Sequence, residues 1–231
     1  IAVIIPCHNE ETGIAHVLSN MPHGHLQKLG YELEVIVIDN NSRDATASVS
    51  QAHGARVLFE SRKGKGNALR TGFRAVSDDA AYVVMLDGDN TYKPHEIPRL
   101  IEPLANGFCD VIVGSRLGGK TMKDAFLLKN RIANWFFTFL VRQFYKANVT
   151  DVLSGFFAWK KEVIDELVDH LESEGFAIEM EMITKMKRLG HEMYSVPITY
   201  DTRAGETKLS AWKDGVRILY ALMRYFFWRP V

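Results

Sequence analysis

The chain has 231 residues, of which 47% are hydrophobic and 24% charged, a composition typical of a globular protein that excludes a disordered one. Its 28 basic and 28 acidic side chains cancel, so we expect no broad electrostatic surface for nucleic acid. Cys7 and Cys109 lack metal-ligand spacing and predict free thiols in a reducing compartment. No stretch reaches the roughly 18 uninterrupted apolar residues of a transmembrane helix, and we expect no signal peptide.

Strand-like runs alternate with helical segments through the first half of the chain. The expected strands are 2–5, 34–39, 56–59, 81–87 and 110–114, and the expected helices are 11–20, 44–53, 66–76 and 94–105. This alternation predicts an α/β fold with a parallel sheet and crossover helices. The second half is expected to contain strands at 154–159 and 192–198, and helices at 124–146, 160–171, 177–189 and 211–228.

Asp87-Gly88-Asp89 follows directly after a strongly apolar predicted strand. Open α/β sheets bind their ligands at the carboxyl ends of their strands. The two carboxylates repel each other, so the pair favours a divalent cation such as Mg²⁺ or Mn²⁺ with phosphate partners. An ordinary turn is the alternative interpretation.

Three further segments end at the same predicted edge. The first strand runs into Pro6, which ends it, and then into Asn9 and Glu10, which suit the start of a helix. Asp39 ends the second strand, where an acidic residue can bind ribose hydroxyls or a base. The basic, glycine-containing segment 62–72 is either a diphosphate-facing loop or a solvated turn. Its spacing excludes a P-loop, and the missing glycine-rich fingerprint argues against a nicotinamide enzyme.

Five motifs, taken in order, resemble the family 2 glycosyltransferases. They are IIPCHNE at 4–10, VIDNNSRDAT at 37–46, DGD at 87–89, GSR at 114–116 and DVLSGF at 151–156. Within that family they are most similar to the polyprenyl-phosphate (dolichyl-phosphate) sugar synthases. The resemblance implies a GT-A fold, with a mostly parallel sheet flanked by helices, a nucleoside-diphosphate sugar donor, and Mg²⁺ or Mn²⁺ bridging its phosphates. It also implies a single domain, residues 1–231, with a donor-binding half at 1–115 and an acceptor-binding half at 116–231.

The resemblance assigns the donor and metal residues by motif position. The implied donor-binding residues are Pro6, Asn9, Glu10, Asp39, Lys65, Gly66, Asp87, Gly88, Asp89, Arg203 and Lys208. Asp87 and Asp89 would hold the metal. Thr91 stands where the family often has a Gln ligand, so Thr91, Asn90 or a water would complete the site. Arg203 and Lys208 would belong to a basic loop that closes over the diphosphate.

The resemblance also places acceptor and catalytic residues in the second half. Arg116, Arg131 and Ser154 would hold the acceptor phosphate, since guanidinium groups bind phosphate oxygens in pairs. The catalytic candidates are Asp89, Asp151, Glu181 and Arg203. Asp151 and Glu181 would position sugar or acceptor, or act as base for a hydroxyl acceptor. Glu179 lies about 200° from Glu181 on the predicted helix, so the two cannot face one cleft.

A lipid monophosphate is already anionic at neutral pH and needs no base. The expected activity is therefore inverting sugar transfer onto a polyprenyl phosphate. Two alternatives stay open: the same chemistry on a saccharide or small hydroxyl acceptor, and a non-catalytic module that binds nucleotide sugars.

The predicted helix at 124–146 is unusually aromatic. Its polar residues form one stripe: Arg131, Asn134, Thr138, Arg142 and Tyr145. Such a helix suits a membrane interface, and burial against the sheet is the alternative. The helix at 211–228 repeats the pattern. We expect a membrane-associated enzyme on the cytoplasmic face, either peripheral or anchored by segments outside this chain.

Overall fold

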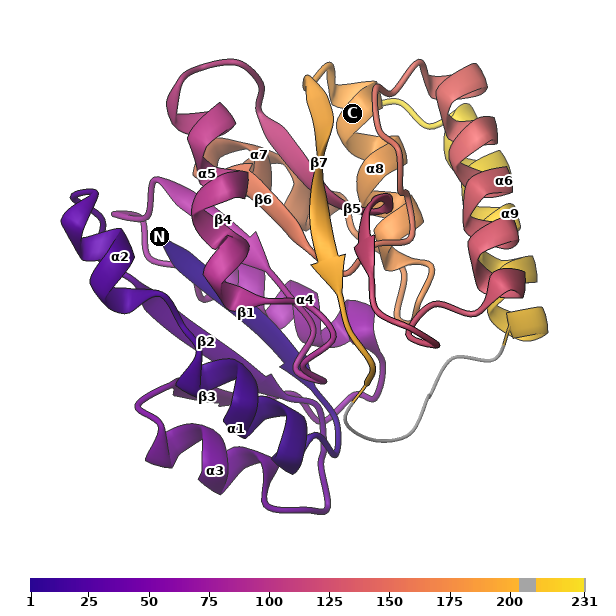
Figure 1. Cartoon of the computed structure of the whole chain (residues 1–231). Helices are drawn as coiled ribbons and strands as arrows, with labels where there is room; N and C mark the ends of the chain where they lie inside the picture. Colours follow the sequence, from indigo (N-terminus) through magenta and orange to yellow (C-terminus); the bar gives the residue numbers. More distant parts are fainter. Residues whose placement is uncertain (204–210, 231) are drawn as a thin grey trace.

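The computed structural model describes residues 1–203 and 211–230 (Figure 1). The strands are β1 (Ala2–Cys7), β2 (Glu34–Asp39), β3 (Arg56–Phe59), β4 (Tyr82–Met85), β5 (Val111–Thr121), β6 (Phe157–Lys160) and β7 (Met193–Tyr200). The helices are α1 (Glu11–Ser19), α2 (His23–Lys28), α3 (Thr46–Ala52), α4 (Lys65–Arg74), α5 (Ile97–Ala105), α6 (Leu128–Tyr145), α7 (Lys161–Leu167), α8 (Ile178–Leu189) and α9 (Ala211–Phe226). Short 3₁₀ turns at Pro94–Glu96 and Val168–His170 precede α5 and follow α7.

All the described strands belong to one sheet, in the order β3-β2-β1-β4-β6-β5-β7. β6 runs antiparallel to β4 and β5, and the other neighbouring strands are parallel. The predicted α/β class with a mostly parallel sheet is therefore confirmed. In β1, Val3 and Ile5 enter one hydrophobic cluster and Ile4 enters the cluster on the opposite face. Burial on both faces explains why these strands are continuously apolar.

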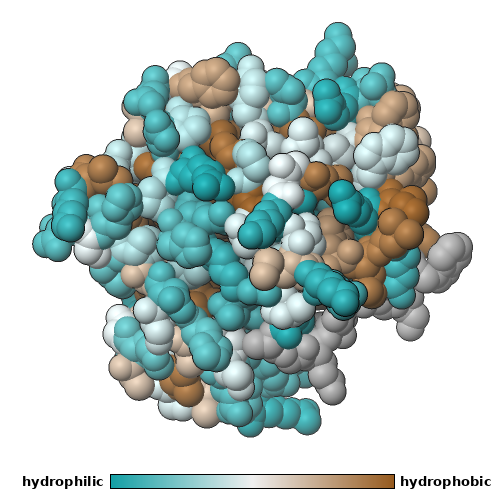
Figure 2. Space-filling view, viewed as in Figure 1, coloured by the Kyte–Doolittle hydropathy of each residue, from teal (hydrophilic) through white to brown (hydrophobic). Residues whose placement is uncertain are grey.

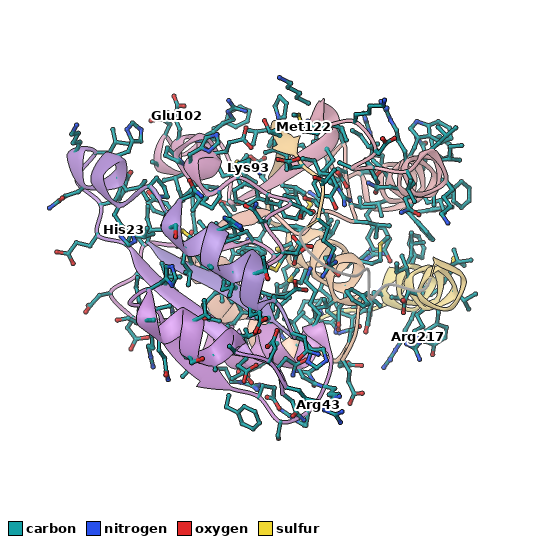
Figure 3. The ribbon with its side chains drawn as sticks, turned by 60° about the horizontal axis from the view of Figure 1, so that its bottom comes forward. His23, Arg43, Lys93, Glu102, Met122 and Arg217 are labelled. Carbon is teal, nitrogen blue, oxygen red and sulfur yellow. The ribbon has the colours of Figure 1, made fainter. Side chains whose placement is uncertain are left out.

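Helices cover both faces of the sheet. The cluster on one face includes residues from α1, α2 and α5, and the cluster on the other includes residues from α4, α6, α7, α8 and α9. Figures 1 and 3 both show α6 and α9 next to each other at one end of the molecule, outside α8. No helix within the described ranges has the length and apolar character required to span a membrane.

Three expectations about the elements were wrong. β6 begins at Phe157 instead of residue 154, because Ser154 and Gly155 form the approach to the carboxyl end of β4. β5 continues to Thr121, so the expected boundary at 115/116 falls inside a strand. The short helix α2 was missed, since it buries only Leu26 and shows no apolar periodicity.

Candidate functional site

A cavity of about 190 Å³ lies at the carboxyl ends of β1, β2 and β4. It brings together seven of the residues predicted to bind donor: Pro6, Glu10, Lys65, Asp87, Gly88, Asp89 and Arg203. Sequence reasoning did not select the other residues that line it: Cys7, His8, Asn40, Lys63, Gly64, Ala68 and Phe176. In Figure 1, β1 and β7 point downwards towards this edge, and Figure 3 brings that side forward, with Arg43 marking the loop after β2.

Glycines allow the turn at 87–89 to pack closely against neighbouring segments, because a side chain at these positions would clash. A Cβ added to Gly88 would lie 2.5 Å from Cys7 Sγ, and one added to Gly13 would lie 2.5 Å from the Gly88 carbonyl oxygen. A Cβ on Gly155 would lie 2.2 Å from Asp87 Oδ2. The Gly155 amide donates a 2.7 Å hydrogen bond to the buried Tyr92 hydroxyl. Gly155 therefore leaves room for the Asp87 carboxylate, and Tyr92 holds Gly155 in place.

Both aspartates of the turn are paired with a cation. Lys65 Nζ lies 2.6 Å from Asp87 Oδ1 and 2.6 Å from Glu179 Oε1. Arg203 Nη1 lies 3.2 Å from Asp89 Oδ2, and its Nη2 donates a 2.5 Å hydrogen bond to Glu10 Oε1. We call these six side chains, from residues 10, 65, 87, 89, 179 and 203, the charge cluster.

The cluster shifts the pKa values of its members. Burial and the neighbouring charge of Asp87 raise the pKa of Asp89, against the lowering effect of Arg203. Burial also raises the pKa of Glu179, which Lys65 partly offsets. Burial alone would lower the pKa of Lys65, but Asp87 and Glu179 together hold it above its ordinary value. A site with closely spaced carboxylates and perturbed pKa values is suited to binding a cation.

The carboxylate oxygens at the cavity suit a divalent metal that also binds a phosphate ligand. Asp87 and Asp89 offer hard carboxylate oxygens beside the cavity, and Mg²⁺ or Mn²⁺ commonly takes one or two carboxylates with substrate phosphates and water. Within the described ranges, no group of three or more His, Cys, Asp or Glu side chains forms a complete metal cage.

Thr91 supports Asp89. Its amide and its hydroxyl both donate to Asp89 Oδ1, at 3.0 and 2.6 Å, and its side chain does not line the cavity. A direct metal contact by Thr91 stays a prediction. Asn90 has a positive φ of 64°, which makes the turn that returns the chain to Thr91.

The basic loop before α4 is fixed from two sides. Asn40 accepts a 2.7 Å hydrogen bond from the Gly64 amide and donates to the Arg62 carbonyl. On the other side, the Gly66 amide donates to the Glu174 carbonyl, and a Cβ on Gly66 would lie 1.9 Å from the Ser173 carbonyl oxygen. Gly66 thus serves close packing and does not itself line the cavity.

Asp39 and Asn9 lie in the loops behind the cavity. Asp39 is buried and accepts a 3.0 Å hydrogen bond from the Ser42 amide. The exposed Asn9 accepts from the Arg43 amide, and its own amide donates to Ser42 Oγ. These contacts tie the loop after β1 to the loop after β2, and direct donor binding by either residue stays a prediction. Lys208 lies outside the described residues.

Two of the expected acceptor and catalytic residues bind each other. Arg116 donates from Nε and Nη2 to both oxygens of Asp151, at 2.8 and 2.9 Å. Asn134 of α6 donates to the same carboxylate. Arg116 is 9% exposed and Asp151 is fully buried, so neither lines the cavity. In this conformation Asp151 holds two of the three guanidinium nitrogens of Arg116, and both phosphate binding by Arg116 and a catalytic role for Asp151 stay predictions.

The remaining candidates are also displaced from the cavity. Ser154 is buried, and its hydroxyl accepts from the Phe156 amide. Glu181 pairs with the buried Lys185 at 2.7 Å and accepts hydrogen bonds from the amides of Glu172 and Ser173. Burial tends to raise the pKa of Glu181, but the bonds from Lys185 and Ser173 hold it below its ordinary value. This carboxylate anchors the backbone at 172–173 to α8, and a catalytic role for Glu181 beside the sugar stays a prediction.

Glu179, and not Glu181, is the glutamate of α8 that belongs to the charge cluster. The helix phase did indicate that only one of the two could face the cleft, but the resemblance selected the other residue. The signal that could have identified Glu179 is Lys65, since a buried lysine beside one aspartate favours a second carboxylate.

α6 buries part of its polar stripe against the protein and exposes much of its apolar surface. Asn134, Thr138 and Tyr145 are buried. The exposed apolar residues of this helix are Leu128, Ile132, Trp135, Phe136, Phe139 and Phe144, and those beside them on α9 and just after it are Val216, Leu219, Tyr220, Met223 and Phe227. We call these eleven side chains the apolar face. Figure 2 shows hydrophobic residues gathered at the side where α6 lies. Most of this apolar surface lies outside the core, and Arg131 is exposed next to it; contact with a membrane stays a prediction.

Comparisons with known proteins agree with this architecture. The model of the family described as "Glycosyl transferase family 2" matches residues 2–168. The chain is 34% identical to the glycosyltransferase AglJ of Haloferax volcanii, over 97% of this chain and 71% of that protein. It is 32% identical to the dolichol-phosphate mannosyltransferase of Pyrococcus furiosus, over 97% of this chain and 64% of that protein. It is 29% identical to the undecaprenyl-phosphate mannosyltransferase of Micrococcus luteus, over 91% and 87%.

Solved structures share the fold. Glucosyl-3-phosphoglycerate synthase from Mycobacterium tuberculosis, in complex with Mn²⁺, UDP-glucose and phosphoglyceric acid, superposes with a TM-score of 0.72. The match covers 100% of this chain and 80% of that chain at 23% identity. At this identity the likeness establishes the GT-A architecture alone.

Proposed function

Because this chain belongs to glycosyl transferase family 2, we propose that it is a metal-dependent, inverting glycosyltransferase that moves a sugar from a nucleoside-diphosphate sugar to a polyprenyl phosphate. Its relatives include proteins named for sugar transfer to dolichol phosphate and undecaprenyl phosphate. The proposed donor is a UDP- or GDP-sugar, and the proposed metal is Mg²⁺ or Mn²⁺.

The observation that carries the donor assignment is the charge cluster at the cavity. Asp87 and Asp89 present oxygens for a divalent cation, and Lys65 and Arg203 present cations within reach of the same carboxylates. A diphosphate needs positive charge on both sides, and a cavity that combines a metal-binding pair with two cations supplies it. A divalent cation bound there would neutralise the charge of the diphosphate leaving group.

The residues of the chain then have distinct tasks. Lys65 and Arg203 bind diphosphate oxygens and stabilise the charge that develops as the bond from the anomeric carbon to the diphosphate breaks. An oxygen of the acceptor phosphate forms the new bond to that carbon from the opposite face, and the nucleoside diphosphate leaves with the bonding electrons. A phosphate oxygen is already anionic, so the step needs no general base. The internal ion pairs of Asp151 and Glu181 are compatible with this chemistry.

We further propose that the apolar face brings the enzyme to a membrane surface, where a polyprenyl phosphate would be found. Trp135 and Phe227 are 62% and 81% exposed, and α6 also exposes Arg131 and Arg142 beside its apolar residues. Aromatic side chains with adjacent cations are typical of helices that lie in a lipid interface. Arg131 is the residue we assign to the acceptor phosphate. The low cysteine content, two residues in 231, is consistent with a cytoplasmic location.

We retain a single domain, in which residues 1–115 act chiefly on the donor and 116–231 chiefly on the acceptor. The division is not strict, because Phe176 and Arg203 of the second half also line the cavity.

The decisive experiment measures transfer of radiolabelled sugar from UDP- and GDP-sugars, with Mn²⁺, into an organic phase that contains a polyprenyl phosphate. We expect label in that phase, and a loss of about 100-fold or more in Asp89→Asn, which removes a metal ligand. Label that instead remains with a soluble saccharide or phosphorylated small molecule would refute the lipid acceptor. If no sugar is transferred from any of the donors tested, the proposal that the protein uses a UDP- or GDP-sugar would be refuted.

A further inference from the structure

Lys65 is held between one carboxylate inside the protein and one at the cavity. Its ammonium lies 2.6 Å from Glu179 Oε1 and 2.6 Å from Asp87 Oδ1. The side chains of Lys65 and Glu179 are 11% and 7% exposed, whereas that of Asp87 is 27% exposed. Asp87 lines the cavity and Glu179 does not. The ammonium therefore has one enclosed partner and one partner that a ligand can reach.

The charges of the cluster do not balance. Four carboxylates, those of Glu10, Asp87, Asp89 and Glu179, face the two cations Lys65 and Arg203. With all groups ionised, two negative charges are left over. One divalent cation would cancel this surplus. Lys65 and Arg203, each now paired with two carboxylates, would then be available to bind a diphosphate.

Lys65 and a divalent cation would compete for Asp87. Asp87 Oδ2 lies against Gly155, where an added Cβ would be 2.2 Å away, and Oδ1 is paired with Lys65. An ammonium and a dication on the same carboxylate would repel each other strongly at this depth. A metal at Asp87 therefore favours release of Lys65.

We infer that Lys65 is an exchangeable counter-ion that occupies Asp87 in the unliganded protein, and that Glu179 is the positioning residue that keeps it at the cavity after Asp87 is taken. Released from Asp87 but still bound to Glu179, the ammonium is presented to the diphosphate. The inference rests on the proposed function, because it takes the donor diphosphate as the second partner of Lys65. It assigns to Glu179 a task that neither the motifs nor the family resemblance indicated.

The exchange is tested by measuring Mn²⁺ binding in the absence of nucleotide. Binding is monitored as the decrease of the free Mn²⁺ signal in electron paramagnetic resonance. Lys65→Gln removes the competing charge and should tighten Mn²⁺ binding about fivefold or more, while it weakens binding of UDP and GDP in the presence of Mn²⁺. Opposite effects on metal and nucleotide are not expected from a damaged fold. Arg74→Gln, which removes a charge at the far end of α4, is the matched control.

Glu179 is tested in two backgrounds. In the wild type, Glu179→Gln leaves Lys65 with Asp87 alone and should weaken Mn²⁺ binding about fivefold. In the Lys65→Gln background the same change should have less than about a twofold effect, because Glu179 acts through Lys65. Glu179→Asp should restore most of the affinity. An equal loss in both backgrounds, or equal losses for the Gln and Asp variants, would contradict the positioning role.

Melting temperatures of all variants establish that they are folded. If Lys65→Gln melts below the assay temperature, the comparison of Glu179→Gln with Glu179→Asp decides the inference alone. A folded Lys65→Gln protein that binds Mn²⁺ no more tightly than the wild type overturns it. That result leaves the proposed function standing, whereas a wild-type protein that binds neither Mn²⁺ nor UDP nor GDP refutes the proposed function itself.

Discussion

Gly155→Ala should disable the site by displacing one carboxylate oxygen. The added Cβ would lie 2.2 Å from Asp87 Oδ2 and 2.7 Å from its Cγ, whereas ordinary contacts begin near 3.4 Å. Asp87 or the Gly155 backbone must therefore move by about 1 Å. The backbone is constrained, because the Gly155 amide is bonded to the buried Tyr92 hydroxyl.

The expected cost follows from this displacement. Overpacking of this kind lowers the free energy of unfolding by about 1–3 kcal/mol. A shift of about 1 Å in a catalytic group lowers the rate by roughly 100-fold. We therefore expect a modest loss of stability in urea denaturation and a much larger loss of sugar transfer and Mn²⁺ affinity. Gly24→Ala is the matched control, since a Cβ at Gly24 meets no atom within 4 Å. Transfer and Mn²⁺ binding within twofold of the wild type in Gly155→Ala would refute the steric argument.

Three further predictions address other parts of the molecule. Thr91→Val removes the 2.6 Å hydrogen bond to buried Asp89, and should lower the free energy of unfolding by about 1.5–3 kcal/mol and weaken Mn²⁺ binding; unchanged values in both assays would contradict the role of Thr91. Trp135→Glu should reduce flotation with anionic phospholipid vesicles by about tenfold or more, whereas Gln143→Glu, an equal charge change at an exposed polar position of α6, should not; equal losses would refute the apolar face as the lipid contact. Hydrogen bonds from Arg62, against the effect of burial, lower the pKa of Glu60 from 4.5 to about 2, so its contribution to stability is complete above pH 4.5 and is lost as the pH falls towards 2. Glu60→Gln should flatten the denaturation profile over this pH range, and a profile that is unchanged would show that Glu60 does not contribute.

The sheet was predictable because its strands are buried on both faces. The expected range 34–39 coincides with β2, because a continuous apolar run identifies a strand buried on both faces without knowledge of its neighbours. The range 56–59 also coincides with β3, although that edge strand is only partly buried. β5 was predicted too short because its last residues, from Ser115 to Thr121, alternate with polar side chains and pair with β7 across an irregular register. That extension depends on a partner about 80 residues away, which local patterns do not contain.

Site residues were predictable only where their position just after a strand brings them to the cavity. Asp87 and Asp89 reach the cavity because they directly follow β4. The partners of charged residues were not predictable, because they come from distant elements. Arg116 looks like a phosphate ligand in the sequence, but it pairs with Asp151, 35 residues away, through Nε and Nη2. Asn134 of α6 donates to the same Asp151 carboxylate. Lys65 and Glu179 are further apart still.

The buried pair of Glu181 and Lys185 lies between α9 and the basic loop before α4. Lys185 lies over the rings of Tyr225, on α9, and Trp228 just after it, at 4.3 and 5.2 Å. Glu181 accepts hydrogen bonds from the amides of Glu172 and Ser173, and the carbonyl oxygens of Ser173 and Glu174 lie against the glycines of the basic loop. These contacts form a continuous packed path from α9 to the loop that ends in Lys65. The path accounts for the burial of Glu181, the residue that sequence reasoning placed beside the sugar.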